Sequence, residues 1–382
     1  MPNQITGVRD QGSGNRDKET NQIPELRPPT PDTRPPIKVL IVEDSPVAQE
    51  FLTYMLTSDP SIQVVGVAHN GAEAIEAVKV KHPDVVTMDI HMPVMDGFEA
   101  TRRIMETVPT PIVIVSGSTG AGEVGGTFRA IEAGALAVVR RPPGIKHEEF
   151  EAGSRELIQT VKLMSEVRVV KRIPRVFKVD VPERPVLSPP LQRTAGIQAI
   201  AIGASTGGPP VLKDILSGLP QGFPVPVLIV QHIAQGFVKG FAEWLSGASR
   251  FPVSVASQGE LLAPGHGYVA PDGFHMGLGN GPTIALSDHA PENHLRPSVS
   301  YLFRSVAQVL GPAAVGVLLT GMGRDGAEEL KVMKEKGAIT IAQDEESSVV
   351  HGMPGEAIKL GAATYVLPPE GITALLVELV KK

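Results

Sequence analysis

One serine lies where a predicted strand turns into a predicted helix. Ser205 is the centre of the pentapeptide GASTG at residues 203–207, which follows the apolar run 197–202 and precedes a Gly-Pro-Pro helix start. This is the G-x-S-x-G pattern of a nucleophile elbow, in which small neighbours relieve crowding at a strained turn. The following helix N-terminus would point at the reacting centre. The pattern predicts a serine nucleophile for acyl transfer.

Two further polar residues follow predicted buried strands. His232 comes directly after the apolar run 227–231, and Asp325 lies in the glycine-rich segment TGMGRDG at 320–326, which ends the run 313–320. Because the carboxyl ends of parallel strands meet along one edge of a sheet, we expect both side chains near Ser205. Ester hydrolysis by serine needs a base and a carboxylate that orients the base. The set predicts Ser205 as nucleophile, His232 as general base and Asp325 as orienting carboxylate.

Each of these residues also has a purely structural interpretation. Ser205 would be a good helix cap in a phosphate-binding loop, Asp325 would cap a helix over 327–336, and an isolated histidine is usually structural. His351 competes as the base, because Ser205, Asp325 and His351 follow the chain order of α/β-hydrolases. His351 lies in a turn-rich loop, however, whereas His232 ends a buried strand that would hold a base rigidly. This difference favours His232.

A second group of polar residues consists mainly of carboxylates. Glu43 and Asp44 end the first predicted strand, Asp89 ends the third, and Ser116 ends the fourth. In a doubly wound sheet these ends converge, and a carboxylate cluster repels itself unless a cation such as Mg²⁺ sits in it. Ser116 adds a hydroxyl for a phosphoryl oxygen. The arrangement predicts Mg²⁺ held by the three carboxylates and phosphorylation of Asp89.

Two acidic residues also allow simpler interpretations. Asp44 would merely precede a helix that Ser45 caps and Pro46 begins. Asp96, which is followed by glycine, would merely form a turn. Taken alone, either residue favours the simpler interpretation.

Short apolar runs that alternate with helix-period segments would position these residues. In the first half, the predicted strands cover 38–42, 64–67, 85–88, 112–115 and 135–139, and helices start at Pro46 and cover 72–80, 98–106 and 147–167. The second half alternates again, and its Gly- and Pro-rich middle, 251–290, predicts antiparallel hairpins. The fold class is α/β: two doubly wound parallel-sheet domains, the first flavodoxin-like, the second Rossmann-like with a hairpin insertion, joined by a flexible linker.

Length and composition agree with two such domains. The 382 residues exceed the usual single-domain size of roughly 100–200 residues. Hydrophobic residues make up 42% of the chain and aromatic residues only 4%, so the cores should be aliphatic, as parallel sheets are. The net charge of -6 gives no basic field for nucleic acid. With no cysteine there is no disulfide or thiol nucleophile.

Segments outside the two domains differ in composition. Residues 1–36 are polar and then proline-rich, which predicts a disordered extension. Residues 168–196 are basic and punctuated by proline, which predicts a linker between domains at 37–167 and 197–382. No apolar stretch approaches the roughly 18 residues of a membrane-spanning helix, and the first residues do not resemble a secretory signal. We therefore expect a cytoplasmic protein without membrane insertion.

Three motifs of the first half resemble the receiver domain of two-component response regulators. They are VEDS at 42–45, MDIHMPVMDG at 88–97 and VSG at 115–117, and the resemblance spans about 37–167. It implies that Asp89 is the phosphoacceptor. One position departs from the family, which carries a lysine where this chain has Arg141. We expect Arg141 to contact the phosphoryl group, although its guanidinium does not replace a compact ammonium exactly in geometry.

Motifs of the second half resemble the catalytic domain of chemotaxis protein-glutamate methylesterases. They are AIGASTGGP at 201–209, QH at 231–232, APG at 263–265, the run 268–272 and TGMGRDG at 320–326. The resemblance spans about 197–382 and implies the Ser205, His232 and Asp325 roles given above. It also implies an oxyanion donor in the backbone N–H of Met322 and a place for Thr206 in the same pocket.

The same resemblance implies a function and partners. The chain would hydrolyse γ-glutamyl methyl esters on the cytoplasmic domain of chemoreceptors, releasing methanol, and would also deamidate receptor glutamines. A chemosensory histidine kinase would donate the phosphoryl group, and phosphorylation would relieve a masking of the esterase cleft by the receiver. The serine site would need no cofactor.

Three other function classes are compatible with parts of the sequence. A general α/β-hydrolase acting on a small ester would use His351 as its base. A nucleotide-binding domain would use the glycines as a phosphate cradle, but no Walker lysine follows them. A catalytically silent, phosphorylation-dependent binding module would not need the Ser, His and Asp set.

Overall fold

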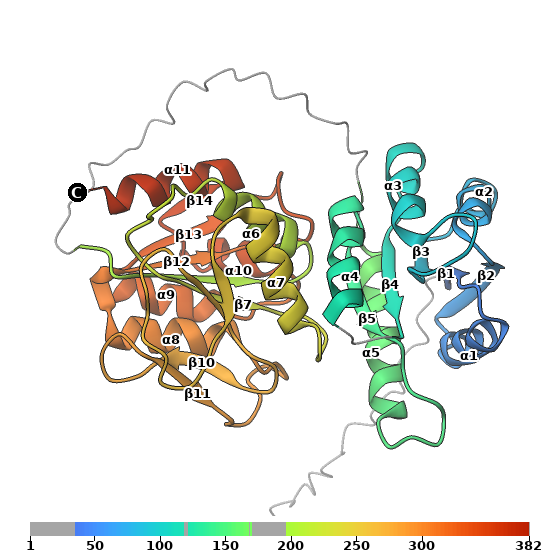
Figure 1. Cartoon of the computed structure of the whole chain (residues 1–382), viewed down its shortest axis with the longest axis horizontal. Coiled ribbons are helices and arrows are strands. Elements are labelled where there is room, and N and C mark those ends of the chain that lie inside the picture. Colours follow the sequence, from blue (N-terminus) through green and yellow to red (C-terminus); the bar gives the residue numbers. More distant parts are fainter. Residues whose placement is uncertain (1–34, 118–120, 168, 170–195, 382) are drawn as a thin grey trace, which may run out of the picture. The chain divides into compact units, whose positions relative to one another are not determined.

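A computed structural model describes residues 35–117, 121–167, 169 and 196–381 (Figure 1). The predicted extension over 1–36 and linker over 168–196 lie almost entirely outside these residues. Two separate parallel sheets, each with helices on both faces, make up the two α/β domains, as predicted from the sequence. None of the helices in the described ranges combines the length and the apolar character that crossing a membrane requires.

The first sheet has five parallel strands in the order β2-β1-β3-β4-β5, the flavodoxin-like order (Figure 1). Its strands are β1 (Ile37–Val42), β2 (Ile62–Ala68), β3 (Val85–Met88), β4 (Ile112–Ser116) and β5 (Ala137–Arg140). Its helices are α1 (Pro46–Thr57), α2 (Gly71–Lys81), α3 (Gly97–Thr107), α4 (Ala121–Ala133) and α5 (Phe150–Ser165). Each predicted strand of this half is present.

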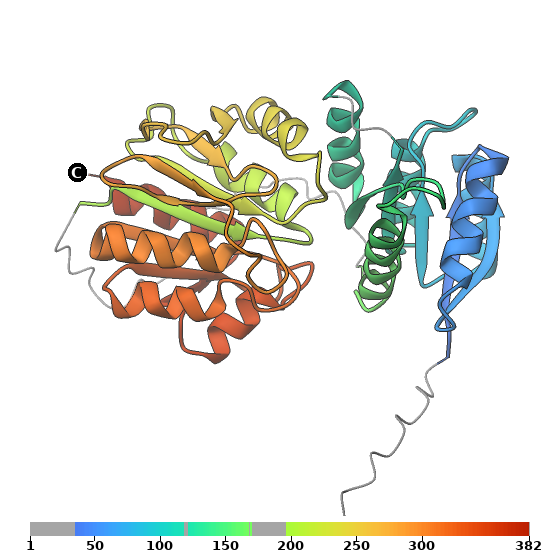
Figure 2. The ribbon, with the colours of Figure 1, turned by 90° about the horizontal axis from the view of Figure 1, so that it is seen from below.

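Alternating side chains of β1 bury the two faces of this sheet. Val39 and Ile41 belong to the cluster that includes α1 and α5, whereas Leu40 and Val42 belong to the cluster that includes α2 and α3. All four side chains are almost completely buried. Helices therefore cover both faces of the sheet (Figure 2).

Polar side chains cap helices α1 and α3. Ser45 caps α1, accepting a hydrogen bond from the N–H of Ala48 at 3.5 Å, and Pro46 opens the helix as predicted. Asp96 is not merely a turn residue. It caps α3 and accepts a hydrogen bond from the N–H of Glu99 at 2.9 Å, which satisfies one of the free donors of the first helical turn.

The second sheet has seven parallel strands in the order β14-β13-β12-β6-β7-β9-β8. They are β6 (Ala199–Ala204), β7 (Val227–Gln231), β8 (Val253–Val255), β9 (Gly267–Val269), β12 (Ala314–Leu318), β13 (Ile339–Gln343) and β14 (Tyr365–Leu367). Its helices are α6 (Gly208–Ser217), α7 (Val238–Ser249), α8 (Val299–Val309), α9 (Ala327–Glu335), α10 (Met353–Lys359) and α11 (Pro369–Val380), with a 3₁₀ turn over Gly311–Ala313.

The segment 251–290 differs in part from the expectation of antiparallel hairpins. Only β10 (His275–Leu278) and β11 (Ile284–Ser287) pair antiparallel. The short strands β8 and β9 instead extend the parallel sheet beyond β7. The loop between β8 and β9 carries the chain back to the starting end of the sheet, so that a parallel register forms where short, glycine-flanked strands had suggested a hairpin.

The strand order fixes where the chemistry can occur. Strand β6 lies between β12 and β7. After β6 the chain first extends the sheet on one side, through β7, and later on the other side, through β12, so that the strand order reverses at β6. Apolar side chains of α6, α7 and α11 cover one face, and those of α8, α9, α10 and the hairpin cover the other. The crevice beyond the carboxyl ends of β12, β6 and β7 is the position where open α/β sheets bind ligands.

Candidate functional site

Ser205 lies directly after β6, in a turn that several backbone bonds hold. Its N–H donates to the carbonyl of Thr320 at 3.0 Å, and its carbonyl accepts from the N–H of Gly208 at 2.8 Å. Gly207 has a φ of 78°, in the left-handed region that favours glycine. A Cβ at Gly321 would come within 2.6 Å of the Ser205 Cβ, so that only glycine allows this close approach. The serine is therefore presented at the carboxyl edge of the sheet.

Strand pairing brings His232 next to Ser205. Ala204 pairs in register with Gln231, and the N–H of His232 donates to the carbonyl of Ala204 at 2.9 Å. The buried Gln231 side chain ties the two segments together, because its Nε2 donates to the carbonyls of Ser205 at 2.9 Å and His232 at 2.8 Å. The predicted nucleophile and base are thus neighbours on adjacent strands.

Asp325 reaches His232 from the loop after β12. The Nε2 of His232 lies 2.9 Å from Oδ2 of Asp325, and the side chains are only 11% and 2% exposed. Because β12 and β7 flank β6, the imidazole must pass the end of β6 to make this contact. The structure therefore brings together the base and the carboxylate that the sequence analysis paired.

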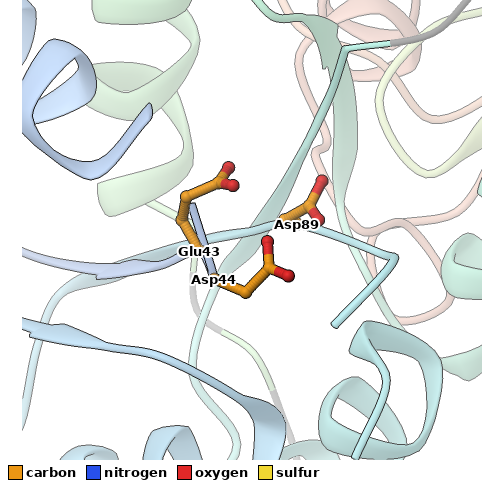
Figure 3. A group of neighbouring side chains, drawn as sticks. All are labelled: Glu43, Asp44 and Asp89. Carbon is orange, nitrogen blue, oxygen red and sulfur yellow. The ribbon is translucent and has the colours of Figure 1, made fainter. Parts of the chain in front are cut away.

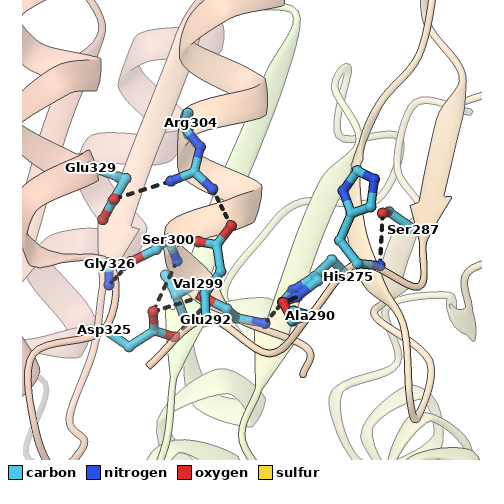
Figure 4. Close-up of polar contacts among 12 residues, drawn as sticks. His275, Ser287, Ala290, Glu292, Val299, Ser300, Arg304, Asp325, Gly326 and Glu329 are labelled. Atoms are coloured by element: carbon cyan, nitrogen blue, oxygen red, sulfur yellow. Dashed lines mark hydrogen bonds and ion pairs between the residues drawn. The ribbon is translucent and has the colours of Figure 1, made fainter. Parts of the chain in front are cut away.

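The Asp325 carboxylate lies at the N-terminus of α8 (Figure 4). Its Oδ1 accepts from the hydroxyl of Ser298 at 2.8 Å and the N–H of Ser300 at 3.2 Å, and its Oδ2 also accepts from the N–H of Val299 at 2.7 Å. Burial alone would raise the pKa of Asp325. The hydrogen bonds from His232, Ser298 and Val299 outweigh that effect and hold its pKa well below the usual carboxyl range.

These contacts contradict the simpler interpretation of Asp325 as the cap of the helix that follows it in the sequence. Gly326, with a φ of 83°, is the N-cap residue of α9, and the Asp325 side chain is engaged with α8 instead. Around it, Arg304 of α8 forms ion pairs with Glu292 and, at 3.3 Å, with Glu329 (Figure 4). Through these ion pairs, Arg304 connects α8 to both the preceding loop and α9, the segments that surround Asp325.

His351 does not take the place that the hydrolase chain order suggested. Its Nδ1 lies 3.4 Å from the hydroxyl of Ser348, and its backbone forms an isolated bridge with Gly321. The Asp325 carboxylate meets His232 and the first residues of α8 instead. The geometry therefore supports His232 over His351 as the base.

Met322 and Thr206 lie on the two loops that meet at Ser205. Met322 follows Gly321, whose own N–H donates to the carbonyl of Val350 at 3.0 Å. Within the described ranges, no intramolecular hydrogen bond engages the N–H of Met322. Thr206 is held through its carbonyl, which accepts from the Thr320 hydroxyl at 2.9 Å. Both residues are half-buried beside the nucleophile turn.

Sequence reasoning did not find the residues that hold Asp325. Ser298, Val299 and Ser300 carry no motif of their own, and their role depends on a contact across 25–27 sequence positions. One signal was present. A serine that follows a proline and precedes an apolar stretch of helical period is a typical N-cap, and Ser298 is the N-cap residue of α8.

The carboxylates of Glu43, Asp44 and Asp89 converge at the ends of β1 and β3 (Figure 3). One oxygen of each lies within 4.8 Å of the others, with Glu43 buried, Asp89 half-buried and Asp44 exposed. Burial, together with the charges of Asp89 and Asp44, raises the pKa of Glu43 to about 7 against the opposing effect of Arg141. Burial also raises the pKa of Asp89. Three carboxylates that offer hard oxygen donors this close together fit a divalent cation such as Mg²⁺.

Arg141 extends into this acidic cluster. Its Nη2 lies 2.6 Å from Oε2 of Glu43 and 3.2 Å from Oδ1 of Asp89, and its backbone N–H donates to the carbonyl of Ser116 at 2.7 Å. Ser116 ends β4 and is buried. The structure therefore collects Glu43, Asp44, Asp89, Ser116 and Arg141 at one edge of the first sheet, as the sequence analysis expected.

Comparisons with known proteins cover both halves of the chain. The family model described as CheB methylesterase matches residues 200–376, and the model described as response regulator receiver domain matches residues 39–147. A solved structure titled as the Thermotoga maritima CheB methylesterase catalytic domain is 38% identical and covers 49% of this chain and 100% of that one, with a TM-score of 0.47.

Curated relatives match over most of their length. The protein-glutamate methylesterase/protein-glutamine glutaminase of Nitrosospira multiformis is 59% identical over 344 residues, which cover 90% of this chain and 97% of that protein. A similarly named protein of Syntrophus aciditrophicus is 57% identical over 345 residues, covering 90% and 98%. With a receiver model followed by a methylesterase model, and with relatives of this identity over nearly their whole length, the chain belongs to the CheB methylesterase family.

Proposed function

We propose that this chain is a phosphorylation-regulated esterase that hydrolyses γ-methyl esters of glutamate side chains in chemoreceptors and also deamidates receptor glutamines. Two relatives with 59% and 57% identity carry both activities in their names. The single observation that carries the proposal is the 2.9 Å contact between His232 and Asp325 beside Ser205. A base held by a buried carboxylate next to a serine is the equipment for acyl transfer.

In the first half-reaction, the Ser205 hydroxyl attacks the carbonyl carbon of the ester while its proton passes to His232. The carbonyl π electrons move to oxygen, and the resulting oxyanion accepts a hydrogen bond from the N–H of Met322. When the carbonyl re-forms, the bond to the methoxy oxygen breaks and His232 returns the proton, so that methanol leaves. The receptor glutamate is now an ester of Ser205, and Thr206 lines the pocket around it.

In the second half-reaction, water replaces the alcohol. His232 takes a proton from water as its oxygen attacks the acyl carbon, and the same proton then returns to Ser205 as the acyl bond breaks. The products are a receptor glutamate and the free serine. With a glutamine substrate the first leaving group is ammonia instead of methanol, and the steps are otherwise the same. Asp325 stays ionised throughout and stabilises the imidazolium.

The receiver half would accept a phosphoryl group on Asp89 from a chemosensory histidine kinase. An oxygen of Asp89 attacks the phosphorus, and the bond from phosphorus to the kinase histidine breaks. Glu43, Asp44 and Asp89 would hold Mg²⁺, which neutralises charge on the phosphoryl oxygens when bound. Ser116 and Arg141 would contact the same oxygens. The converging donors at the ends of β1, β3 and β4 support these roles.

Phosphorylation would then control the esterase. The proposal is that the unphosphorylated receiver restrains access to Ser205 and that phosphorylation relieves the restraint. Support comes from the presence of both family models in one chain, receiver first. The reaction would take place in the cytoplasm, where the kinase and the methylated helices of the receptor are found.

The test is methanol release from a methylated receptor fragment by the full chain. Ser205→Ala should abolish release. With Mg²⁺ and a small phosphoryl donor such as acetyl phosphate, the wild type should accelerate, whereas Asp89→Asn should stay at the basal rate. Equal rates for wild type and Asp89→Asn would refute the regulation, and undiminished release by Ser205→Ala would refute the serine mechanism.

A further inference from the structure

The Asp325 carboxylate is saturated with donors, and one of them is a side chain. Two of its four hydrogen bonds come from the backbone of Val299 and Ser300, one from His232, and one from the Ser298 hydroxyl. Each carboxylate oxygen accepts two bonds, which uses the lone pairs available to it. The backbone donors fix Asp325 at the start of α8. Ser298 is therefore the side-chain donor, apart from the base itself, through which a substitution can test this arrangement.

The contact assigns the two imidazole nitrogens of His232. An ionised carboxylate only accepts, so the nitrogen that faces Asp325 must carry the proton, and that nitrogen is Nε2. In the neutral ring Nδ1 is then the acceptor. This is the reverse of the Ser-His-Asp template in serine proteases, where the carboxylate binds Nδ1 and the serine binds Nε2.

The strand order explains the reversal. Ser205 and His232 follow residues that pair directly, and adjacent strands are about 4.8 Å apart. For a serine beside the histidine backbone, the ring nitrogen within reach would be the near one, Nδ1. Asp325 follows β12, on the far side of β6, and only the distal Nε2 extends to it. The near nitrogen is left for Ser205.

Ser298 is itself held from behind. Its N–H donates to Nδ1 of His275 at 3.3 Å, and Nε2 of the same ring lies 3.2 Å from the carbonyl of Ala290 (Figure 4). A carbonyl accepts, so Nε2 of His275 carries a proton and Nδ1 is free to accept from Ser298. The His275 ring is fully buried and stacks on the Tyr301 ring, with 4.7 Å between the ring centroids and an interplanar angle of 15°. The position of Ser298 is thus fixed on the side away from Asp325.

From these contacts, and resting on the proposed esterase function, we infer that Ser298 is a positioning residue: its hydroxyl orients Asp325 so that His232 keeps a proton on Nε2 and receives the Ser205 proton on Nδ1. During acylation the Ser205 proton adds to Nδ1, which gives an imidazolium with a proton on each nitrogen. The Nδ1 proton then passes to the leaving methoxy oxygen. The Nε2 proton stays on the ring through the cycle, facing Asp325.

The tautomer can be read by nitrogen NMR of the full chain labelled with ¹⁵N-histidine. The chain has ten histidines, and the His232 signals are those lost in His232→Gln. The spectra are recorded at a pH high enough that only one of the two His232 ring nitrogens carries a proton. The wild type should show a protonated Nε2 and an unprotonated Nδ1. The opposite tautomer would overturn the inference, and this result does not depend on any activity.

Substitutions at Ser298 test its role. Ser298→Ala should convert His232 to a mixture of tautomers and lower kcat for methanol release about tenfold, the effect of one hydrogen bond to a charged group, with KM unchanged. Ser298→Thr keeps a hydroxyl and should restore both. The matched control is Ser305→Ala, also on α8, whose hydroxyl bonds Leu278 instead and whose loss should leave kcat and the His232 signals unchanged.

The outcomes separate the inference from the function on which it rests. If Ser298→Ala has the kcat and the His232 spectrum of the wild type, Ser298 does not position the site. Methanol release that survives in Ser205→Ala refutes the serine esterase, whatever the tautomer. If Ser298→Ala lowers both the melting temperature and kcat, and Ser298→Thr restores neither, the loss of activity reflects a packing defect. That result would also overturn the positioning role.

Discussion

The Arg141 guanidinium lies 2.6 Å from the Glu43 carboxylate. A metal ion bound at the acidic cluster would need the same carboxylate as a ligand. The same Nη2 contacts Asp89 at 3.2 Å. A planar guanidinium can bond two carboxylates at once, whereas a lysine ammonium acts as a compact point charge. Arg141 is therefore a resident counter-charge of the cluster, and it affects both cation binding and the carboxylate that accepts the phosphoryl group.

Removal of Arg141 should strengthen Mg²⁺ binding. Arg141→Ala removes a positive charge within a few ångströms of the cation, which should tighten Mg²⁺ binding about tenfold. Calorimetric titration of the full chain with Mg²⁺ measures this. Arg140→Ala is the matched control, because Arg140 faces the exposed Glu149 at 3.8 Å and should leave the affinity unchanged. Equal or weaker binding by Arg141→Ala would contradict the counter-charge role.

Glu43 should make both stability and Mg²⁺ binding depend on pH. Its folded-state pKa of about 7 lies above the ordinary glutamate value of 4.5, so the folded chain retains a proton that the unfolded chain releases. The free energy of unfolding contributed by this group is therefore full below about pH 4.5 and declines as the pH rises toward 7. Mg²⁺ needs the ionised form, which is about one tenth populated at pH 6, so binding should be about tenfold weaker at pH 6 than at pH 8.

The check on Glu43 is a pair of titrations. Mg²⁺ affinity of the wild type is measured at pH 6 and pH 8, and the free energy of unfolding is measured without Mg²⁺ from pH 4.5 to pH 8. Glu43→Gln cannot ionise at this position, so its stability should lack the decline between pH 4.5 and 7. A wild type whose Mg²⁺ affinity is the same at both pH values would show that Glu43 is not a ligand.

Much of this arrangement could be predicted from the sequence, because local signals set it. The apolar runs at 85–88 and 227–231 agree with β3 and β7, and Ser45 with Pro46 starts α1 as expected. The position of a residue that directly follows a buried strand, such as His232, is set by that strand. The parts that could not be predicted depend on contacts between distant segments. The ladder that makes β8 and β9 parallel, and the docking of Asp325 on α8, leave no local pattern.

The choice between His232 and His351 has a direct kinetic test. His232→Gln removes the ring that contacts Asp325, and kcat should fall by at least about four orders of magnitude, as for loss of a member of a catalytic triad. His351→Ala removes a ring whose contact is Ser348 at 3.4 Å, and kcat should change by less than about threefold. The reverse pattern would identify His351 as the base, in the chain order of α/β-hydrolases.

The nucleophile turn should depend on Gly207 through both its backbone and its surroundings. A Cβ at this position, where φ is 78°, would come within 2.5 Å of the Val349 side chain. Gly222→Ala is the matched control, because φ is 73° there but a Cβ would meet nothing within 4 Å. Gly222→Ala should lose about 1 kcal/mol of unfolding free energy from backbone strain alone, and Gly207→Ala about 1–3 kcal/mol more from overpacking.

The single tryptophan makes these two variants easy to compare. Trp244 lies on α7, so its fluorescence during urea unfolding reports on the domain that contains Ser205. Gly207→Ala should also lower kcat, because relief of the clash shifts the turn that holds Ser205, whereas Gly222→Ala should not. If both variants lose the same stability and both retain full methanol release, then the contact with Val349 does not constrain the turn, and the φ of Gly207 alone explains the glycine.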